Sequence, residues 1–555
     1  MLNQNKGNRA YKLFDFLHRH IIAIIIAVVI CASIISTIAI VKGDAGPKEQ
    51  DQDGENVSYV SMNAIYLAMD EVSTLNPLIS QDEDTYYISQ LIFSSLFRLD
   101  ESLNIQNDAV SSYTVDTQSG SVSLKLKENV KFSDGSSLTA EDVQFTVRQI
   151  LQIGEESPYY EYASKIESVD TSGNYSLTIQ FENPGDAALD NLVFPIVSSS
   201  DYSTSQERSM GSGQYRCSSY DRGKSLSLSP NKYYHGNAAE NKIQFKVIPD
   251  KSKTLGLMTT DAITAYMSTS QDADVEAEDK KLNAQKINSS ELEFIGFNFE
   301  CDFLSDARVR KSIAKAIDTE SLITDDYGGA AISADSIYFP GFLGTKNEGD
   351  AYPQNQSEAA ELLSECGYVD TDEDGILEDK KGKKVQLSIL VNSNRENRAD
   401  AAYSIAEELQ EIGIDAEVES VSWSTYRSRI RSGDFDLYIG GYKFDKKYDL
   451  SALFSKNNSI NYRNQQILDS VEQLETCLTA EGQKKVYQQL KKELQEDLPY
   501  YCLCYKVYTF VTVEHFNSEE SPTFFDIYRG CSSWTWEKTV VQEDSGDEED
   551  TSETN

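Results

Sequence analysis

The sequence contains few of the residues and motifs that enzymes use for catalysis. Its 555 residues include only four histidines, and the motifs HExxH, GxSxG, CxxC and the phosphate-binding P-loop are absent. The glycine-rich stretches at residues 210–215 and 439–444 lack the strand-to-helix context of a nucleotide phosphate site. We therefore expect neither an enzyme nor a bound cofactor or metal.

Positive charge is also scarce. Lysine and arginine total 50 against 90 aspartate and glutamate residues, which gives a formal net charge of -40. Nucleic-acid binding requires clusters of basic residues that contact phosphates, so this function is excluded. Tyrosine, with 32 residues, outnumbers phenylalanine with 22. Because a tyrosine ring has one polar end, this composition suits a wet binding cleft.

The eight cysteines show no disulfide pattern. Seven of them follow the hydrophobic segment described next, an odd number, and their spacing does not repeat. Cys502 and Cys504 alternate along a predicted strand, which would place both on one face, where regular geometry does not let them bond to each other. We expect reduced, buried cysteines.

One long hydrophobic run lies near the N-terminus. Residues 21–41 contain no charge, and at about 1.5 Å per residue they span a bilayer core of about 30 Å. Basic residues precede the run and acidic residues follow it, which places residues 1–20 in the cytoplasm and the rest outside. A signal peptide has a shorter apolar core of about 7–15 residues. Cys31 follows bulky Ile30, whereas a lipidation site has a small residue there. We predict an uncleaved transmembrane anchor.

Polar segments flank the rest of the chain. Residues 42–57 form a predicted linker and residues 541–555 a predicted disordered acidic tail. Between them, strands and helices alternate without a repeat, which predicts a mixed α/β ectodomain. Strands are expected at residues 58–68, 121–126, 175–181, 225–228, 243–248, 385–391, 416–421 and 437–442. Helices are expected at residues 86–96, 140–151, 306–316, 358–365, 398–412 and 480–497.

The stretch NVKFSDGSSLTAEDVQFTVRQIL at residues 129–151 predicts a strand, a turn and a capped helix. Val130 and Phe132 alternate with polar residues, as in a half-buried strand. Gly135 can adopt the positive φ of the turn, and Thr139 can cap the helix that follows. These roles are structural, and no catalytic group is needed here.

A second acidic stretch, DTDEDGILEDKKG, has the start of a calcium loop. Asp370, Asp372, Asp374 and Gly375 have the required spacing, but the twelfth position, where a glutamate is expected, is Lys381. An acidic β-hairpin turn explains the same residues. We predict no metal site from this pattern alone.

Several ordered blocks match one protein family. They are STLNPL (73–78), IFSSLFRLD (92–100), LKLKENVKFSDGSSLTAEDVQF (124–145), GSGQYRCSSYDRGKSLSLSPNKYYHG (211–236), FIGFNFECDFLSDARVRKSIAKAIDTESLI (294–323), EAAELLSECGY (358–368) and GDFDLYIGGY (433–442). On these blocks the chain resembles the family 5 extracellular solute-binding proteins, the dipeptide- and oligopeptide-binding components of ABC importers.

The resemblance implies an α/β, two-lobed periplasmic-binding-protein-like fold of the large, type II peptide-binding class, with an extra inserted domain and, here, a preceding transmembrane helix. A ligand cleft between the lobes would close by a hinge. The implied division is lobe one at residues 58–80, 201–298 and 506–540, an inserted domain at 81–200, and lobe two at 299–505.

The resemblance also implies the residues that bind the ligand. In peptide-binding members an aspartate after a GGW strand pairs with the ligand's α-amino group, and GGYKFD places Gly441, Tyr442 and Asp445 there. The two lysines after Asp445 could instead neutralise it at the surface. The arginine that meets the ligand carboxylate in dipeptide binders is absent from its expected position, and Arg395 or Arg398 could substitute for it. The missing clamp favours oligopeptides over dipeptides.

The sequence thus predicts a membrane-anchored extracellular protein that captures peptides in an interlobe cleft and delivers them to an ABC importer. Its expected partners are the peptide, the importer's permease subunits and, through the N-terminal helix, the cell membrane. It is expected to be a monomer. A peptide sensor, or a receptor for another solute such as a nickel chelate or a sugar, is the alternative on the same fold.

Overall fold

The computed structural model describes residues 49–50, 56–445, 448–455 and 457–541. The predicted anchor, the cytoplasmic segment and nearly all of the acidic tail lie outside these residues. Within the described ranges, no helix has the length and apolar character needed to cross a membrane. The chain divides into two compact units, one built from both ends of the chain and one from residues 64–514 and 518–534.

The smaller unit contains a four-stranded antiparallel sheet of order β1-β2-β21-β20. Its strands are β1 (Glu49–Gln50), β2 (Asn56–Ser61), β20 (Phe516–Asn517) and β21 (Thr535–Val541). The single strand predicted at residues 58–68 was wrong, because β2 ends at Ser61 and β3 (Ala64–Met69) starts a separate strand. The two strands have different partners, β21 for β2 and β12 with β13 for β3, so the chain changes sheets between them.

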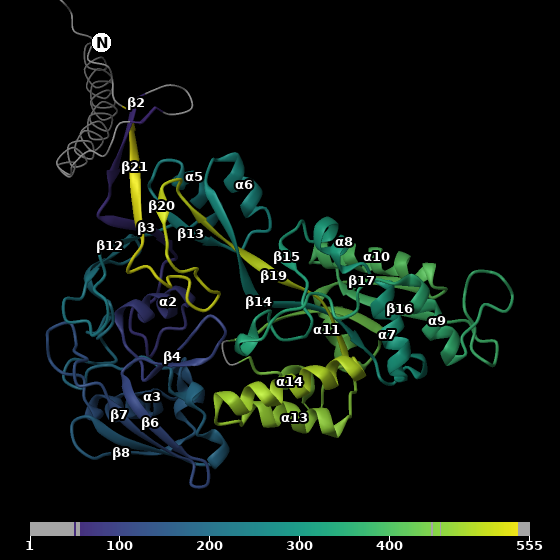
Figure 1. Cartoon of the computed structure of the whole chain (residues 1–555), viewed down its shortest axis with the longest axis horizontal. Coiled ribbons are helices and arrows are strands. Elements are labelled where there is room, and N and C mark those ends of the chain that lie inside the picture. Colours follow the sequence, from purple (N-terminus) through teal and green to yellow (C-terminus); the bar gives the residue numbers. More distant parts are fainter. Residues whose placement is uncertain (1–48, 51–55, 446–447, 456, 542–555) are drawn as a thin grey trace, which may run out of the picture. The chain divides into compact units, whose positions relative to one another are not determined.

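The larger unit is built on an eleven-stranded mixed sheet with the order β10-β11-β12-β3-β13-β19-β14-β18-β16-β17, and β15 pairs with β19 outside this path. The strands not yet given are β10 (Tyr215–Asp221), β11 (Ser225–Pro230), β12 (Lys242–Val247), β13 (Ala265–Ser268), β14 (Asn283–Phe297), β15 (Ala331–Ile332), β16 (Gln386–Asn392), β17 (Asp415–Val421), β18 (Leu437–Lys443) and β19 (Tyr500–Thr512). β19 and β14 pair with each other in the middle of this order, with β13 beside β19 and β18 beside β14 (Figure 1).

Alternation along these strands places a hydrophobic core on each face of the sheet. On β14, Phe294 belongs to one core, and its neighbour Ile295 belongs to the other. On β18 the same alternation separates Tyr438 from Ile439. Because neighbouring side chains of a strand point to opposite faces, one sheet supports both cores.

A β-bulge corrects the prediction for the two strand cysteines. The pairing of β14 with β19 shifts register between Glu293 and Phe294, opposite Cys504 and Cys502. An extra residue, Leu503, lies between these partners, so the two cysteines enter different cores rather than sharing one face. Both thiols are buried and free, and burial raises their pKa values well above the usual range. Burial was predicted for all the cysteines; it is observed for this pair and for Cys531, whereas Cys217, Cys301, Cys366 and Cys477 are only partly buried.

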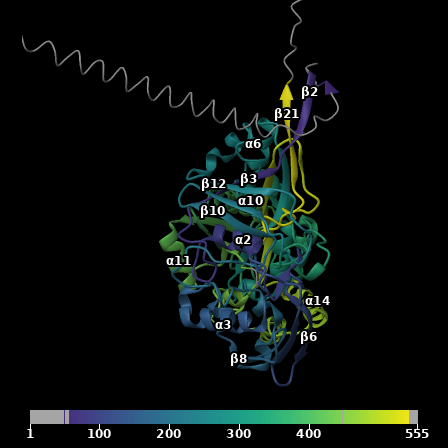
Figure 2. The ribbon, with the colours of Figure 1, turned by 90° about the vertical axis from the view of Figure 1, so that its left-hand side faces the viewer.

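The region between residues 81 and 200 holds a separate antiparallel sheet of order β6-β7-β9-β8. Its strands are β6 (Val110–Asp116), β7 (Ser121–Leu126), β8 (Ile166–Thr171) and β9 (Ser176–Phe181), and the hairpin β4 (Phe97–Leu99) and β5 (Ile105–Asn107) precedes them. Figure 2 shows α3 (Ala140–Ile153) beside β8.

The predicted helix cap in this region is confirmed. The Asp142 carboxylate accepts hydrogen bonds from the Thr139 N–H at 2.8 Å and the Thr139 hydroxyl at 2.9 Å, which closes a capping box. Gly135 has φ 98°, as the turn requires. The strand predicted at Val130 and Phe132 is reduced to an isolated bridge between Lys131 and Ser137, although both apolar residues are buried.

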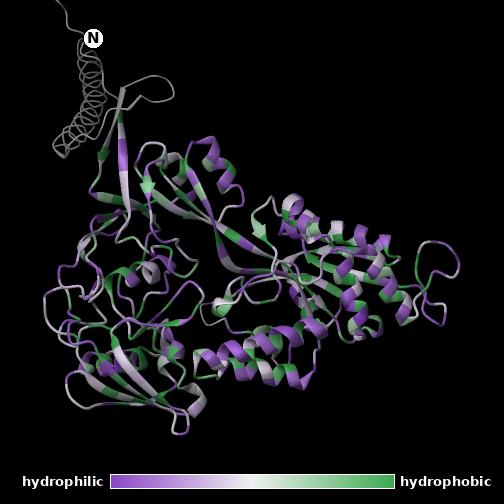
Figure 3. Cartoon of the chain, viewed as in Figure 1, coloured by the Kyte–Doolittle hydropathy of each residue, from purple (hydrophilic) through white to green (hydrophobic). Residues whose placement is uncertain are grey.

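The remaining helices mostly cover the larger sheet and are amphipathic, with hydrophilic and hydrophobic residues alternating along them (Figure 3). They are α2 (Glu83–Ile92), α4 (Tyr160–Ala163), α5 (Thr254–Met258), α6 (Ala273–Asp279), α7 (Ala307–Ala316), α8 (Thr319–Ser321), α9 (Gln356–Cys366), α10 (Glu396–Glu411), α11 (Trp423–Ser432), α12 (Ser451–Phe454), α13 (Gln465–Glu475) and α14 (Ala480–Asp497). Short helical turns are η1 (Gly154–Glu156), η2 (Pro184–Asp186), η3 (Leu189–Leu192), η4 (Lys251–Lys253), η5 (Asp302–Ser305), η6 (Leu322–Asp326) and η7 (Phe342–Gly344). The helix predicted at 86–96 begins three residues earlier, because Asp82 precedes it as N-cap and acids occupy its first turn.

Glu408 on α10 gives a testable pH dependence. Burial raises its pKa from 4.5 to about 7, against a hydrogen bond from the Asp318 N–H that lowers it. Since the folded state then holds the extra proton, the free energy of unfolding falls as pH rises from about 4.5 to 7. We expect Glu408→Gln to be more stable than the parent at pH 8 by about 1 kcal/mol, allowing for solvent screening, and equal to it near pH 4.

Urea denaturation at both pH values measures this difference. Glu407→Gln changes an exposed carboxylate on the same helix and should leave the free energy of unfolding nearly unchanged at either pH. Equal stabilities of Glu408→Gln and the parent at pH 8 would contradict the assignment.

Candidate ligand-binding site

The C-terminal end of β18 is fixed by hydrogen bonds to β14. The Phe444 N–H donates to the Ser290 carbonyl at 3.0 Å, and the Ser290 hydroxyl donates to the Phe444 carbonyl at 2.7 Å. Ser290 lies in the stretch of β14 where its pairing with β19 shifts register. The irregular strand therefore holds the residue that follows, Asp445, at a defined position.

Asp445 begins a tight turn and is itself exposed. Its Oδ1 accepts a hydrogen bond from the Tyr448 N–H at 3.1 Å, and Tyr448 has a positive φ of 56°. The Tyr448 ring stacks on Phe444, with ring centroids 4.4 Å apart and an interplanar angle of 19°. The turn is thus held by backbone bonds and by ring stacking, which orients the carboxylate.

Asp445 lines a cavity of about 350 Å³. The cavity wall is formed by parts of segments 77–87, 158–162, 443–445 and 524–525, together with Ser290. Its aromatic lining consists of Tyr86, Tyr87, Tyr159, Tyr162, Phe444, Phe524 and Phe525. Among the described residues, its charged lining consists of Asp82, Glu83, Glu161, Asp445 and Lys443. A cavity with this excess of carboxylates favours a positively charged group.

The tyrosine hydroxyls of this wall remain protonated. Burial, with a further contribution from the Asp445 charge, raises the pKa of Tyr162 well above its ordinary value. Burial and the charge of Glu83 raise the pKa of Tyr87. The Tyr87 hydroxyl lies 2.9 Å from the Phe524 carbonyl and 3.1 Å from Glu83 Oε1. The wall thus combines apolar rings with neutral hydroxyls that donate hydrogen bonds.

Two further cavities adjoin these residues. One of about 210 Å³ shares Glu83, Tyr87 and Lys443 with the first. Another, of about 320 Å³, is lined by Tyr448 and by residues of segments 99–115, 189–190, 338–343 and 474–483. Phe444 and Asp445 thus line the first cavity, and Tyr448 lines the cavity of about 320 Å³.

Gly441 lies against a buried ion pair. Arg398 Nη2 donates to Glu293 Oε1 at 2.8 Å, its Nε contacts the other oxygen, and Lys506 Nζ lies 3.3 Å from Oε1. Glu293 is directly opposite Gly441 in the β14–β18 pairing and is 1% exposed. A Cβ at Gly441 would lie 1.7 Å from Arg398 Nη2, so only glycine leaves room for the guanidinium.

The other predicted site residues lie apart from the cavity of Asp445. Tyr442 is partly buried, with its ring edge-on to Phe444 at 4.7 Å, and burial raises its pKa. Arg395 is exposed at the N-cap of α10. The structure thus brings Gly441, Arg398 and Glu293 together and leaves Asp445 in the cavity.

Sequence reasoning missed the aromatic wall and Glu293. The wall is assembled from segments far apart in the chain, and only the high tyrosine content signalled it. Glu293 lies in a stretch whose burial depends on both neighbouring strands, β18 and β19, and no local pattern signals that.

A model of the bacterial extracellular solute-binding proteins, family 5 (middle region), matches residues 104–461. The chain belongs to this family. It is therefore an extracellular solute-binding protein and not an enzyme, as predicted.

Similar proteins support the family and the fold. The oligopeptide-binding protein AppA of Bacillus subtilis is 27% identical over 473 residues, covering 78% of this chain and 84% of AppA. The structure of AppA in complex with a nonapeptide gives a TM-score of 0.54 at 23% identity, covering 85% of this chain and 98% of that one. The murein tripeptide-binding protein MppA, in its unliganded open form, gives 0.75 at 18% identity and covers 87% and 99%. NikA from Brucella suis, with Fe(III)-EDTA, gives 0.66 at 19% identity and covers 85% and 99%. The predicted α/β periplasmic-binding-protein-like fold is confirmed.

Proposed function

We propose that this protein binds peptides, oligopeptides rather than dipeptides, in the cavity at Asp445, and delivers them to an ABC importer. The observation that carries the proposal is the Asp445 carboxylate, which accepts a hydrogen bond from the Tyr448 N–H, in a cavity whose described lining holds four carboxylates and Lys443. A peptide's α-amino group is the cation that such a cavity suits.

Pairing with a carboxylate is what makes capture of the amine favourable. An ammonium group that leaves water without a partner loses several kcal/mol of solvation. A charge-assisted hydrogen bond to Asp445 replaces that solvation and fixes the peptide's register. The tyrosine hydroxyls and ordered water then serve backbone and side-chain groups of varied sequence.

Oligopeptides are favoured because neither Arg395 nor Arg398 is placed to read a ligand carboxylate at a fixed short distance. Arg398 is engaged with Glu293, and Arg395 is exposed at the start of α10. The peptide's C-terminus can then lie at varied distances from Asp445, and the cavity of about 210 Å³ that shares Glu83, Tyr87 and Lys443 offers further space. The similar protein AppA is an oligopeptide-binding protein whose structure contains a nonapeptide.

The remaining parts of the proposal concern location and organisation. Residues 21–41 would anchor the protein in the cell membrane, with the binding unit outside and the importer's permease subunits as partners. Residues 58–80, 201–298 and 506–540 would form lobe one, 81–200 the inserted domain and 299–505 lobe two of a monomer. The strands β14 and β19, which run through both halves of the sheet, would then act as hinge strands.

Native mass spectrometry of the full chain, purified without refolding, tests the proposal. We expect the protein to carry a mixture of peptides, released on denaturation and sequenced by tandem mass spectrometry. Peptides of more than three residues should predominate over dipeptides. A nickel chelate or a sugar as the bound species would instead support the alternative reading of the same fold.

A further inference from the structure

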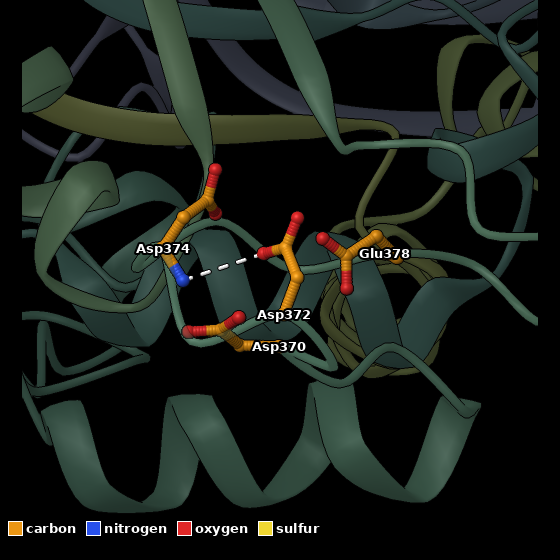
Figure 4. A group of neighbouring side chains, drawn as sticks. All are labelled: Asp370, Asp372, Asp374 and Glu378. Carbon is orange, nitrogen blue, oxygen red and sulfur yellow. Dashed lines mark hydrogen bonds between the residues drawn. The ribbon is translucent and has the colours of Figure 1, made fainter.

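A compact group of carboxylates lies in the loop between α9 and β16, which does not line the cavity of Asp445 (Figure 4). Asp370, Asp372, Asp374 and Glu378 each offer one oxygen, and these four oxygens lie within 4.8 Å of one another. Cation sites for hard divalent ions are built from such oxygens.

The loop brings the fourth carboxylate to the other three by hydrogen bonding. The Gly375 N–H, at φ 92°, donates to Asp370 Oδ2 at 2.9 Å, which closes the turn. Val369 and Glu378 then pair as an antiparallel bridge, with hydrogen bonds of 3.1 and 3.0 Å. Glu378 is the ninth residue counted from Asp370, so it supplies a carboxylate where the sequence pattern lacks one at Lys381.

The second observation is the state of Glu378. Its side chain is only 4% exposed, and its Oε2 accepts hydrogen bonds from the Thr371 N–H at 2.8 Å and hydroxyl at 2.7 Å. Its Oε1 is buried and has no hydrogen-bond partner among the described residues, and the same holds for Asp370 Oδ1. Figure 4 shows the Glu378 carboxylate turned toward Asp372. Two buried carboxylate oxygens without partners point to a missing ligand, because leaving such atoms unsatisfied is unfavourable.

We infer that this loop binds one calcium ion, ligated by Asp370, Asp372, Asp374 and Glu378. Lys384, whose Nζ contacts Asp374 and lies 3.5 Å from Asp372 Oδ2, supplies only one positive charge to four carboxylates. A divalent ion neutralises more of that charge and also satisfies the two buried oxygens. Calcium suits the site better than magnesium, because it accepts irregular oxygen geometry from a loop, whereas magnesium requires a near-ideal octahedron.

Calcium titration of the full chain by calorimetry, after treatment with EDTA and removal of the chelator, tests this site. We expect one ion per chain with a Kd of about 10⁻⁴ to 10⁻³ M, the range of extracellular calcium modules. Glu378→Gln should weaken binding at least about tenfold, as loss of an aligned metal-site group does. Glu373→Gln is the matched control, because Glu373 is an exposed acid of the same loop outside the ligand set. It should change the Kd by less than about threefold.

Thermal unfolding shows whether the Glu378→Gln variant has a folding defect. In EDTA, Glu378→Gln should melt with the parent, since a glutamine oxygen can still accept the Thr371 bonds. Added calcium should raise the melting temperature of the parent and of Glu373→Gln more than that of Glu378→Gln. If Glu378→Gln melts early, Asp372→Asn, which changes an exposed ligand, decides by the same tenfold criterion. Absence of saturable calcium binding, or equal Kd values for the parent and the ligand variant, would overturn the inference.

Discussion

Replacing Glu293 with methionine will destabilise the protein by about 3–5 kcal/mol, the usual effect of removing one partner from a buried ion pair. The substitution leaves the Arg398 guanidinium, which is 14% exposed, and the nearby Lys506 without their shared carboxylate. Burial by itself lowers the pKa of Arg398, and the hydrogen bond to Glu293 raises it above the ordinary value. The carboxylate thus offsets the unfavourable burial of this cation.

Urea denaturation of three variants measures the effect. Arg398→Met should be less harmful than Glu293→Met, because Lys506 remains 3.3 Å from Glu293. The double variant should recover part of the loss, since it also removes the lone Arg398 charge and leaves Lys506, which still has Glu291 at 3.9 Å. Arg308→Met, in an exposed pair with Asp306, is the control and should change the stability little. A similar small loss for Glu293→Met would show that the pair is solvated.

The second large effect is expected at Asp445, in the binding of peptides. Asp445→Asn should weaken binding of an oligopeptide with a free amino terminus by at least about 30-fold, which corresponds to about 2–5 kcal/mol. The asparagine oxygen can still accept the hydrogen bond from the Tyr448 N–H, so the turn should persist. The loss would then report the missing charge.

Glu161→Gln is the matched control for this substitution. Glu161 is another acid of the same cavity wall, and its side chain is exposed to water. If the cavity attracts the peptide only by its general negative charge, both substitutions should weaken binding equally. Direct pairing at Asp445 predicts that Glu161→Gln loses no more than about fivefold, the effect of an exposed charge.

Local sequence patterns predicted those elements of the fold that depend on residues close to one another in the chain. The helix at residues 480–497 is observed with those bounds as α14, and α3 is capped as Thr139 indicates. The division of residues 58–68 into two strands was not predictable, because it depends on partners β21 and β12, which are distant in the chain. The β-bulge that separates Cys502 from Cys504 likewise depends on the register of β14.

The residues of the site also fall into those that the sequence predicted and those that it did not. Asp445 was predicted from the family's motif, and the structure places it in the wall of a cavity. The engagement of Arg398 by Glu293 could not be predicted, since these residues are 105 positions apart, on α10 and β14. The carboxylate at Glu378 was missed because the sequence pattern directed attention to the twelfth loop position, whereas the hairpin returns the ninth.

The affinity of the parent protein for one oligopeptide in two forms, with a free and with an acetylated amino terminus, tests the central claim most directly. Calorimetry on the full chain should show that acetylation weakens binding at least about 30-fold in the parent and much less in Asp445→Asn, because both changes remove the same charge pair. Equal affinities of the parent for the two peptides would contradict capture of the amino terminus at Asp445.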